Sequence, residues 1–299
     1  MKHAFLVIAH NEEPLLLSLL KQLDYERFDV YLHIDAKAKA LRESIQAQQL
    51  RFSNLTIVEN PVSVYWGDRS QVASELLLFK TACQHGPYAY YHLLSGVDLL
   101  LKSPSEVYRF FEAHHGKEFI NFWDKDDARR ELNRRVQRYY FFTKNLKDKG
   151  TFVHAITAPI RNISLAIQKV TSFKRCGRGI YFRKGSNWVS ITEECCKYIV
   201  ENADELYKRL NHTLCADEIF VQTIVWNSPF KDNIFEADVE STETSVVRKI
   251  DWTRGHPYVW QKADIQELLH SSALFARKFS SKNMSLVNEI LKYTLEEEK

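Results

Sequence analysis

Through its first half the chain alternates short apolar runs with helical patterns, and this alternation limits the folds that it can adopt. Runs rich in β-branched or aromatic residues predict strands, and the amphipathic stretches between them predict helices. The predicted strands are Ala4–Ala9, Val30–Ile34, Leu55–Val58, Tyr90–Leu94 and Phe119–Phe122, and the predicted helices are Pro14–Leu23, Ser70–Gln84 and Pro104–His114. Strand, helix and strand in succession predict a Rossmann-like α/β fold, with a mostly parallel sheet flanked by helices.

The polar residues that follow these strands predict a ligand site at one edge of the sheet. His10 and Asn11 follow the first strand, Asp35 ends the second, and Ser95 and Asp98 follow the fourth. In an open parallel sheet, ligands bind at the carboxyl ends of the strands. The first strand is not followed by a GxGxxG motif, and the chain has no P-loop motif, which disfavours a nicotinamide dinucleotide site and an NTPase site. We expect Asp35 and Asp98 to contact a nucleotide.

The 299 residues contain no internal repeat and no low-complexity linker, so we expect one domain over residues 1–299. Residues 125–184 differ from the rest, because they are irregular and carry 16 Lys and Arg against 4 Asp and Glu. Inside this basic segment, Ile156, Ile160, Ile163, Ile167 and Val170 recur at spacings of four and three, which predicts an amphipathic helix. Its apolar face either packs on the core or contacts a membrane surface.

The charge distribution disfavours nucleic acid as a partner and favours anionic lipid or an anionic acceptor. The whole chain has a formal charge of only +3, and the basic segment contains no recognisable nucleic-acid-binding module, so we exclude nucleic acid. A basic, amphipathic segment is typical of a surface that contacts anionic lipid or an anionic acceptor. We therefore expect the protein to be cytoplasmic, with peripheral contact to the inner face of the membrane through residues 125–184.

Cysteine spacing and hydropathy agree with that location. Five cysteines, at positions 83, 176, 195, 196 and 215, show no metal-ligand spacing and are predicted to be reduced thiols. No run approaches the ~18 apolar residues of a membrane span. The N-terminal MKHAFLVIAHNEEP is interpreted as a first strand rather than a signal peptide.

Seven short motifs, in order, resemble one enzyme family. They are AFLVIAHNE, HIDAK, VYWGDRSQVASELLL, YYHLLSGVDLLLKS, KGSNWVSIT, DEIFVQTI and LFARKF, which together extend from about residue 4 to residue 279. This set resembles the core-2/I-branching β-1,6-N-acetylglucosaminyltransferase family, which the peptide O-xylosyltransferases share. Residues 125–180 match little of that pattern.

The resemblance implies a GT-A type fold and an inverting glycosyltransferase that uses a UDP-sugar, most often UDP-N-acetylglucosamine, without a metal ion or other cofactor. The acceptor would be an oligosaccharide or a glycolipid. By position, Glu218 in DEIF is the catalytic base, and Lys278 in ARKF neutralises the diphosphate together with Arg254. The nucleotide site would include His10, Asp35, Trp66, Ser70, Ser95 and Asp98, and Trp188 and Trp252 would lie near the acceptor.

Reaction chemistry independently favours one carboxylate and nearby cations. An inverting transfer is a single displacement, and a nucleoside diphosphate leaves without protonation, so one general base suffices. Cations at the leaving phosphates act mainly in the transition state. Asp217, directly before Glu218, is predicted to cap the helix while Glu218 projects about 100° away, into the cleft.

Three alternatives remain open at this stage. Asp124 and Asp126 form a D-x-D string after a predicted strand, as in metal-dependent GT-A transferases, although a solvated loop is the commoner interpretation. A UDP-xylose-dependent transferase would use the same site residues. A carbohydrate-binding protein without turnover would keep the fold but need neither Glu218 nor Lys278. The histidines show no HExxH or other close spacing, so no zinc site is predicted.

Overall fold

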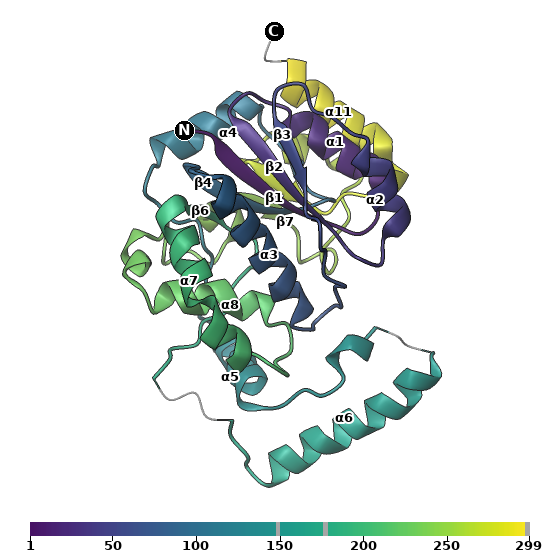
Figure 1. Cartoon of the computed structure of the whole chain (residues 1–299), viewed down its shortest axis with the longest axis vertical. Helices are drawn as coiled ribbons and strands as arrows, with labels where there is room; N and C mark the ends of the chain where they lie inside the picture. Colours follow the sequence, from purple (N-terminus) through teal and green to yellow (C-terminus); the bar gives the residue numbers. More distant parts are fainter. Residues whose placement is uncertain (148–149, 176–178, 297–299) are drawn as a thin grey trace.

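The computed structural model describes residues 1–147, 150–175 and 179–296 (Figure 1). Within these residues the main sheet has five strands in the order β3-β2-β1-β4-β6. Four of them are parallel and β6 runs antiparallel to β4; the strands are β1 (His3–Ala9), β2 (Phe28–Ile34), β3 (Asn54–Ile57), β4 (Tyr90–Ser95) and β6 (Ser190–Thr192). The predicted fold class, a Rossmann-like α/β fold with a mostly parallel sheet flanked by helices, is confirmed.

Each face of the sheet has its own hydrophobic core. In β1, Phe5 and Val7 belong to one core and Ala4 and Leu6 to the other, because successive side chains of a strand point to opposite faces. Helices α1 (Glu13–Leu23), α4 (Pro104–Ala113) and α11 (Met284–Glu296) contribute to the first core, and α3 (Ser70–His85), α7 (Glu193–Arg209) and α8 (Asp217–Trp226) contribute to the second. The exposed helix α2 (Lys39–Gln46) buries only Leu41 and Ile45. A parallel sheet covered on both faces explains the nearly continuous apolar runs of its strands.

A second sheet orders the C-terminal part of the chain. Its described strands run in the order β5-β8-β7, with β5 (Leu99–Leu100) antiparallel and β7 (Arg248–Ile250) parallel to β8 (Phe275–Arg277). The fully buried Arg248 joins the two sheets, because its guanidinium donates to the carbonyls of Leu93 and Val189 at 3.0 and 3.1 Å. Burial lowers the pKa of Arg248 to about 9. Ile250 lies opposite Arg277, so the residues that follow β7 and β8 emerge at the same edge.

The predicted helices and the first four predicted strands are present, and α4 begins at Pro104 with Ser103 as its N-cap, which forms a capping box with Glu106. The strand predicted at Phe119–Phe122 is wrong. This segment makes only isolated bridges, from Glu118 to Ile234 and from Phe119 to Ser190. It forms no ladder because β6 is only three residues long and, past the bridge at Ser190, the N–H of Thr192 donates to the side chain of Glu118 at 2.9 Å instead of to a backbone carbonyl.

The basic segment is more regular than its sequence indicates. It contains α5 (Asp126–Gln137), which was not predicted, and α6 (Phe152–Val170), which confirms the predicted amphipathic helix. Helix α6 lies at the foot of the molecule, beyond α5 and away from the two sheets (Figure 1). Among the described residues, no helix is both long enough and apolar enough to cross a bilayer.

The cysteines that the structure describes are Cys83, Cys195, Cys196 and Cys215, and all four are free thiols. The Sγ atoms of Cys83 and Cys196 lie 3.2 Å apart, between α3 and α7. Cys176, which was also predicted to be a reduced thiol, lies outside the described residues.

The remaining helices are short. They are α9 (Thr242–Ser245) and α10 (Ile265–Leu269), with 3₁₀ turns at Thr143–Asn145, Pro229–Asn233, Lys262–Asp264 and Ser281–Asn283.

Candidate active site

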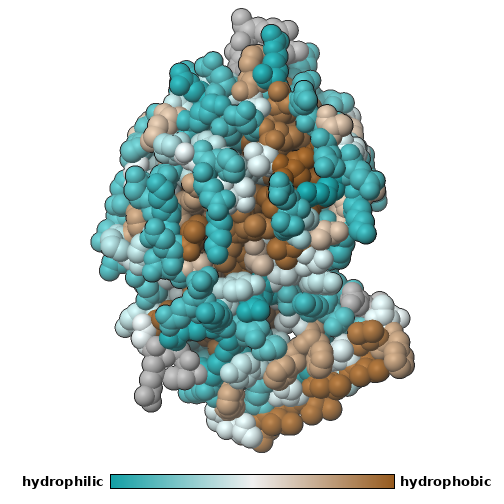
Figure 2. Space-filling view, viewed as in Figure 1, coloured by the Kyte–Doolittle hydropathy of each residue, from teal (hydrophilic) through white to brown (hydrophobic). Residues whose placement is uncertain are grey.

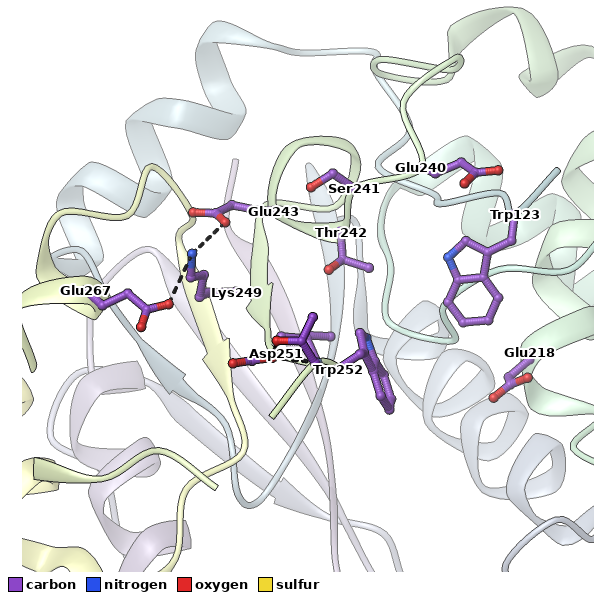
Figure 3. Close-up of a pocket in the computed structure, with 12 residues that line it drawn as sticks. Trp123, Glu218, Glu240, Ser241, Thr242, Glu243, Lys249, Asp251, Trp252 and Glu267 are labelled. Atoms are coloured by element: carbon purple, nitrogen blue, oxygen red, sulfur yellow. Dashed lines mark hydrogen bonds and ion pairs between the residues drawn. The ribbon is translucent and has the colours of Figure 1, made fainter. Parts of the chain in front are cut away.

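A cleft of about 590 Å³ opens beside the N-terminal end of α8, between the segment after Phe122 and the loop that follows β7 (Figure 3). Its lining combines two tryptophans with several carboxylates: Trp123, Glu218, Glu240, Ser241, Thr242, Glu243, Lys249, Ile250, Asp251, Trp252, Thr253 and Glu267. Figure 3 shows Trp123, Trp252 and Glu218 around one opening. Aromatic faces beside a carboxylate can hold a sugar ring and accept a proton from its hydroxyl.

Glu218 is held by two cations from the basic segment. Its Oε2 atom lies 2.6 Å from Nη1 of Arg135 on α5 and 3.5 Å from Nζ of Lys184. Both cations also pair with Glu131, one helical turn before Arg135. Burial alone would lower the pKa of Arg135, but the charges of Glu218 and Glu131 outweigh that effect and raise it. Two acids and two bases therefore form a closed ion-pair network at the edge of the cleft.

A glycine allows this network to form. The N–H of Gly185 donates to the backbone carbonyl of Glu218 at 2.9 Å, which places Lys184 against α8. A Cβ atom at Gly185 would lie 1.8 Å from the carbonyl oxygen of Asn121, far inside van der Waals contact. Only glycine fits between these two backbone segments.

Asp217 does not cap α8, so that prediction is wrong. The N-cap position is Ala216, which has no side-chain cap bond, and Asp217 points inward, where its Oδ2 accepts from Gln71 Nε2 at 3.0 Å. Burial, with the charge of Glu218 as the second cause, raises the pKa of Asp217 from 3.8 to about 7. Burial and the charge of Asp217 also raise the pKa of the fully buried Glu75. The sequence could not show this, because it does not reveal which face of α8 packs on α3.

The predicted nucleotide residues gather partly at the carboxyl edge of the main sheet. The N–H of Asp35 donates to the carbonyl of Ala9, the residue before His10, at 2.9 Å. Partial burial lowers the pKa of His10, while the charge of Asp35 raises it and the charge of Lys278 lowers it. Asp35 is buried, and its carboxylate accepts from the backbone N–H of Lys37 at 2.9 Å. Lys278 is half-buried between the fully buried Phe275 and Phe279.

Asp98 and Ser95 form a second, enclosed cluster at this edge. The carboxylate of Asp98 accepts from the hydroxyl and the backbone N–H of Ser95 at 2.6 and 2.9 Å. The Nε atom of Arg277 lies 3.5 Å from Asp98, and its guanidinium lies 4.1 Å from the ring centroid of Trp188. Sequence analysis missed Arg277, although it directly precedes Lys278 in the ARKF motif.

The other predicted residues lie in different surroundings. Trp66 is exposed, with Lys147 Nζ 4.7 Å from its ring centroid, and Ser70 Oγ accepts from the N–H of Tyr65 at the start of α3. Trp252 is exposed and lines the cleft, whereas Trp188 is buried beneath Arg277 and does not. Trp123, which sequence analysis did not single out, lines the cleft instead; its place in the apolar run FINFW gave no signal of exposure.

Arg254 is surrounded by acids. Its guanidinium contacts the carboxylates of Asp251, Asp264 and Glu267, the latter two at 2.9 Å. The cleft residues Asp251 and Trp252 directly follow β7, and Lys278 directly follows β8, the parallel strand paired with β7. Arg254 comes two residues after Trp252. These three carboxylates balance the charge of Arg254 in this conformation, so a diphosphate would compete with them for the guanidinium.

In the D-x-D alternative, a metal ion would likewise compete with cations that already pair with Asp124. The carboxylate of Asp124 pairs with Arg183 at 2.6 Å and with Arg129 at 3.7 Å, while Asp126 begins α5. Among the described residues, no group of three or more His, Cys, Asp or Glu side chains is arranged to hold a metal ion.

Comparisons with known proteins agree on one family. The family described as "Core-2/I-Branching enzyme" matches residues 3–270. Xylosyltransferase 2 of Canis lupus familiaris is 22% identical over 309 residues, covering 98% of this chain and 33% of the relative. A xylosyltransferase of Ciona intestinalis is 20% identical over 302 residues, covering 96% of this chain and 33% of the relative. The chain thus spans about a third of the length of the curated relatives it matches.

Among solved structures, the apo form of mouse xyloside xylosyltransferase 1 is similar over 92% of this chain and 96% of that chain. The identity is 12% and the TM-score is 0.38, too low for the likeness to place the fold.

The buried Asp217 generates a prediction on stability. The folded chain keeps the Asp217 proton up to a pKa of about 7, while the unfolded chain releases it near 3.8. The folded state therefore binds more protons in this window, and the free energy of unfolding falls as pH rises through it. Asp217→Asn should remove that loss and stabilise the protein at pH 8 by on the order of a few kcal/mol, with little effect near pH 4.

Urea denaturation at both pH values measures this difference, with exposed Asp232→Asn as the matched control. An effect of Asp217→Asn that is equal at both pH values would contradict the assignment.

Proposed function

The chain belongs to the core-2/I-branching enzyme family, and from this premise we propose that it is an inverting, metal-independent glycosyltransferase. Its donor is a UDP-sugar, with N-acetylglucosamine as the first candidate for the sugar transferred. Its acceptor is a hydroxyl group of an oligosaccharide or glycolipid.

The observation that carries this proposal is the position of Glu218. Its side chain lines the cleft with Trp123 and Trp252, and its Oε2 atom is fixed by Arg135 and Lys184. Within the described part of the chain, no hydrogen bond or ion pair is made by Oε1, which leaves this oxygen for a substrate. A fixed carboxylate with one unused oxygen suits a general base.

In the proposed reaction, the acceptor oxygen attacks the anomeric carbon while the bond from that carbon to the diphosphate oxygen breaks. The leaving diphosphate takes the bonding electron pair, and Glu218 takes the proton of the attacking hydroxyl. One displacement inverts the anomeric centre. Trp252 and Trp123 would orient the acceptor sugar, because the C–H-rich face of a pyranose packs on an aromatic ring.

The charge that develops on the diphosphate needs a counter-charge. The charge of Lys278 acts on His10, which follows β1 at the carboxyl edge of the sheet, where the uridine is proposed to bind. Asp98, Ser95, Trp66 and Ser70 are proposed to shape the same site. Lys278, with Arg254 as its partner, would do what a divalent ion does in other transferases.

A second candidate donor is UDP-xylose, which is favoured by the names of the similar proteins, since they are xylosyltransferases. Both donors present the same nucleotide and diphosphate to this chain. A transfer assay with UDP-N-acetylglucosamine, UDP-xylose and a GDP-sugar distinguishes the candidates, and activity with only the GDP-sugar would contradict the proposed nucleotide site.

Replacement of the base provides the main test of the mechanism. Glu218→Gln keeps the size of the side chain but removes its basicity, so kcat should fall by at least ~10²-fold while binding of UDP is unchanged. Glu201→Gln, which makes the same change at an exposed carboxylate of α7 outside the cleft, is the matched control and should keep most of the activity. Near-normal transfer by the Glu218→Gln variant would show that another group accepts the proton.

Chelation tests the source of the counter-charge. EDTA should change the rate little, whereas Lys278→Ala should lower kcat by about 10²- to 10³-fold, because a preorganised cation at a leaving phosphate is worth several kcal/mol. The exposed Lys282→Ala, four residues further along, is the control. Loss of activity in EDTA that Mn²⁺ restores would contradict the proposal and favour the Asp124–Asp127 loop.

A further inference from the structure

Helix α6 has its polar side turned toward the protein and its apolar side turned toward water. The buried residues of the helix are Thr157 and Gln168. The side chain of Gln168 exchanges hydrogen bonds with the backbone of Tyr139, donating at 3.0 Å and accepting at 2.8 Å. At the other end of the helix, His154 Nδ1 donates to the carbonyl of Asn145 at 3.0 Å. Polar contacts thus fix the orientation of α6.

The opposite side of the helix forms a continuous exposed apolar face. It consists of Phe152, Val153, Ile156, Ile160, Ile163, Ile167 and Val170, which are between 47% and 84% exposed. Figure 2 shows these side chains as a hydrophobic stripe along the outer edge of α6. Of the two alternatives left open by the sequence, packing of this face on the core is therefore wrong. A contiguous apolar surface that is exposed to water indicates a binding partner.

The charges around this face identify the kind of partner. Residues 152–170 contain Arg161 and Lys169 but no Asp or Glu. Exposed lysines lie on both sides of the helix in sequence: Lys144 and Lys147 before it and Lys174 after it. An amphipathic helix with an apolar face and basic flanks is the composition that binds at an anionic lipid surface.

A basic cavity lies next to the end of α6. Its volume is about 440 Å³, and its lining includes Phe173, Lys174, Arg175, Lys208 and Arg209. Phe173 is fixed to the end of the helix, because its N–H donates to the carbonyl of Gln168 at 3.0 Å. A cavity with four cations beside an apolar stripe can receive the phosphate of a lipid headgroup while the acyl chains contact the helix.

We propose that the exposed face of α6 docks on an anionic lipid bilayer, lying in its interface without crossing it. A second copy of the chain fits the same face less well. A symmetric dimer through α6 would bring together two basic segments of the same sign, and their repulsion would oppose association. An anionic bilayer attracts the same charges. This proposal does not depend on the transferase activity, because lipid binding is measured without donor or acceptor.

Co-sedimentation of the full chain with vesicles tests the proposal. We expect binding to vesicles of phosphatidylcholine mixed with phosphatidylglycerol, weaker binding at high salt, and little binding to phosphatidylcholine alone. Ile160→Glu with Ile163→Glu should reduce the bound fraction by at least about tenfold, because two charges replace the centre of the inserted face. Both side chains are exposed, so the fold should survive, as circular dichroism can verify.

The matched control is Phe52→Glu, which places the same charge on an exposed apolar residue remote in sequence from α6. It should bind vesicles like the wild type. Lys169→Glu with Lys174→Glu supplies a second variant that leaves the apolar face intact and should also weaken binding. The proposal is overturned if the wild type does not bind anionic vesicles at low salt, or if the α6 variants bind as well as the wild type. Dimers that only the isoleucine variant abolishes, without vesicle binding, would assign the face to a second copy.

Discussion

The ion-pair network of Glu131, Arg135, Lys184 and Glu218 is the constraint on which the architecture of the site depends. The side chains of Arg135 and Lys184 are almost entirely removed from water, so each needs a nearby acid. Removing one partner from a buried pair typically destabilises a protein by about 3–5 kcal/mol, because the other charge is left without compensation. The network therefore fixes the basic segment against α8 at the position where the cleft opens.

This constraint changes the role of the basic segment. From its composition, residues 125–184 resemble an insertion that serves only the surface. In the structure, one part of the segment supplies Arg135 and Lys184 to the carboxylate proposed as the base, and another part presents the apolar face of α6. The two parts are joined through Tyr139, two residues after α5, which Gln168 of α6 binds through its backbone. One segment thus links the proposed lipid surface with the proposed catalytic cleft.

The sequence predicts those parts of the molecule that follow from local pattern. The strands predicted from Ala4 and Tyr90 and the helix predicted from Pro104 rest on local apolar patterns, and all of them are present. The sequence also indicates the carboxyl edge of the sheet, because Asp35 and His10 directly follow strands. Long-range pairing is not encoded in this way. The contact of Arg135 with Glu218 joins residues 83 positions apart.

The inward turn of Asp217 and the failure of Phe119–Phe122 to form a ladder have the same origin. Each depends on a neighbour that is distant in sequence: Gln71 of α3 binds Asp217, and β6 is too short to extend the single bridge at Ser190 into a ladder. The orientation of α6 is a further case. Its period is evident in the sequence, but whether the isoleucines point inward or outward is decided by Gln168 and His154, whose partners lie outside the helix.

In the proposed mechanism, Glu218, held by Arg135 and Lys184, accepts the proton of the acceptor while Lys278 faces the diphosphate. A crystal structure with UDP and an acceptor bound together tests it most directly. We expect the acceptor hydroxyl within about 2.6–3.2 Å of the Glu218 carboxylate and the diphosphate beside Lys278. An acceptor hydroxyl that contacts a different carboxylate, or a diphosphate bound at Asp124 through a metal ion, would contradict it.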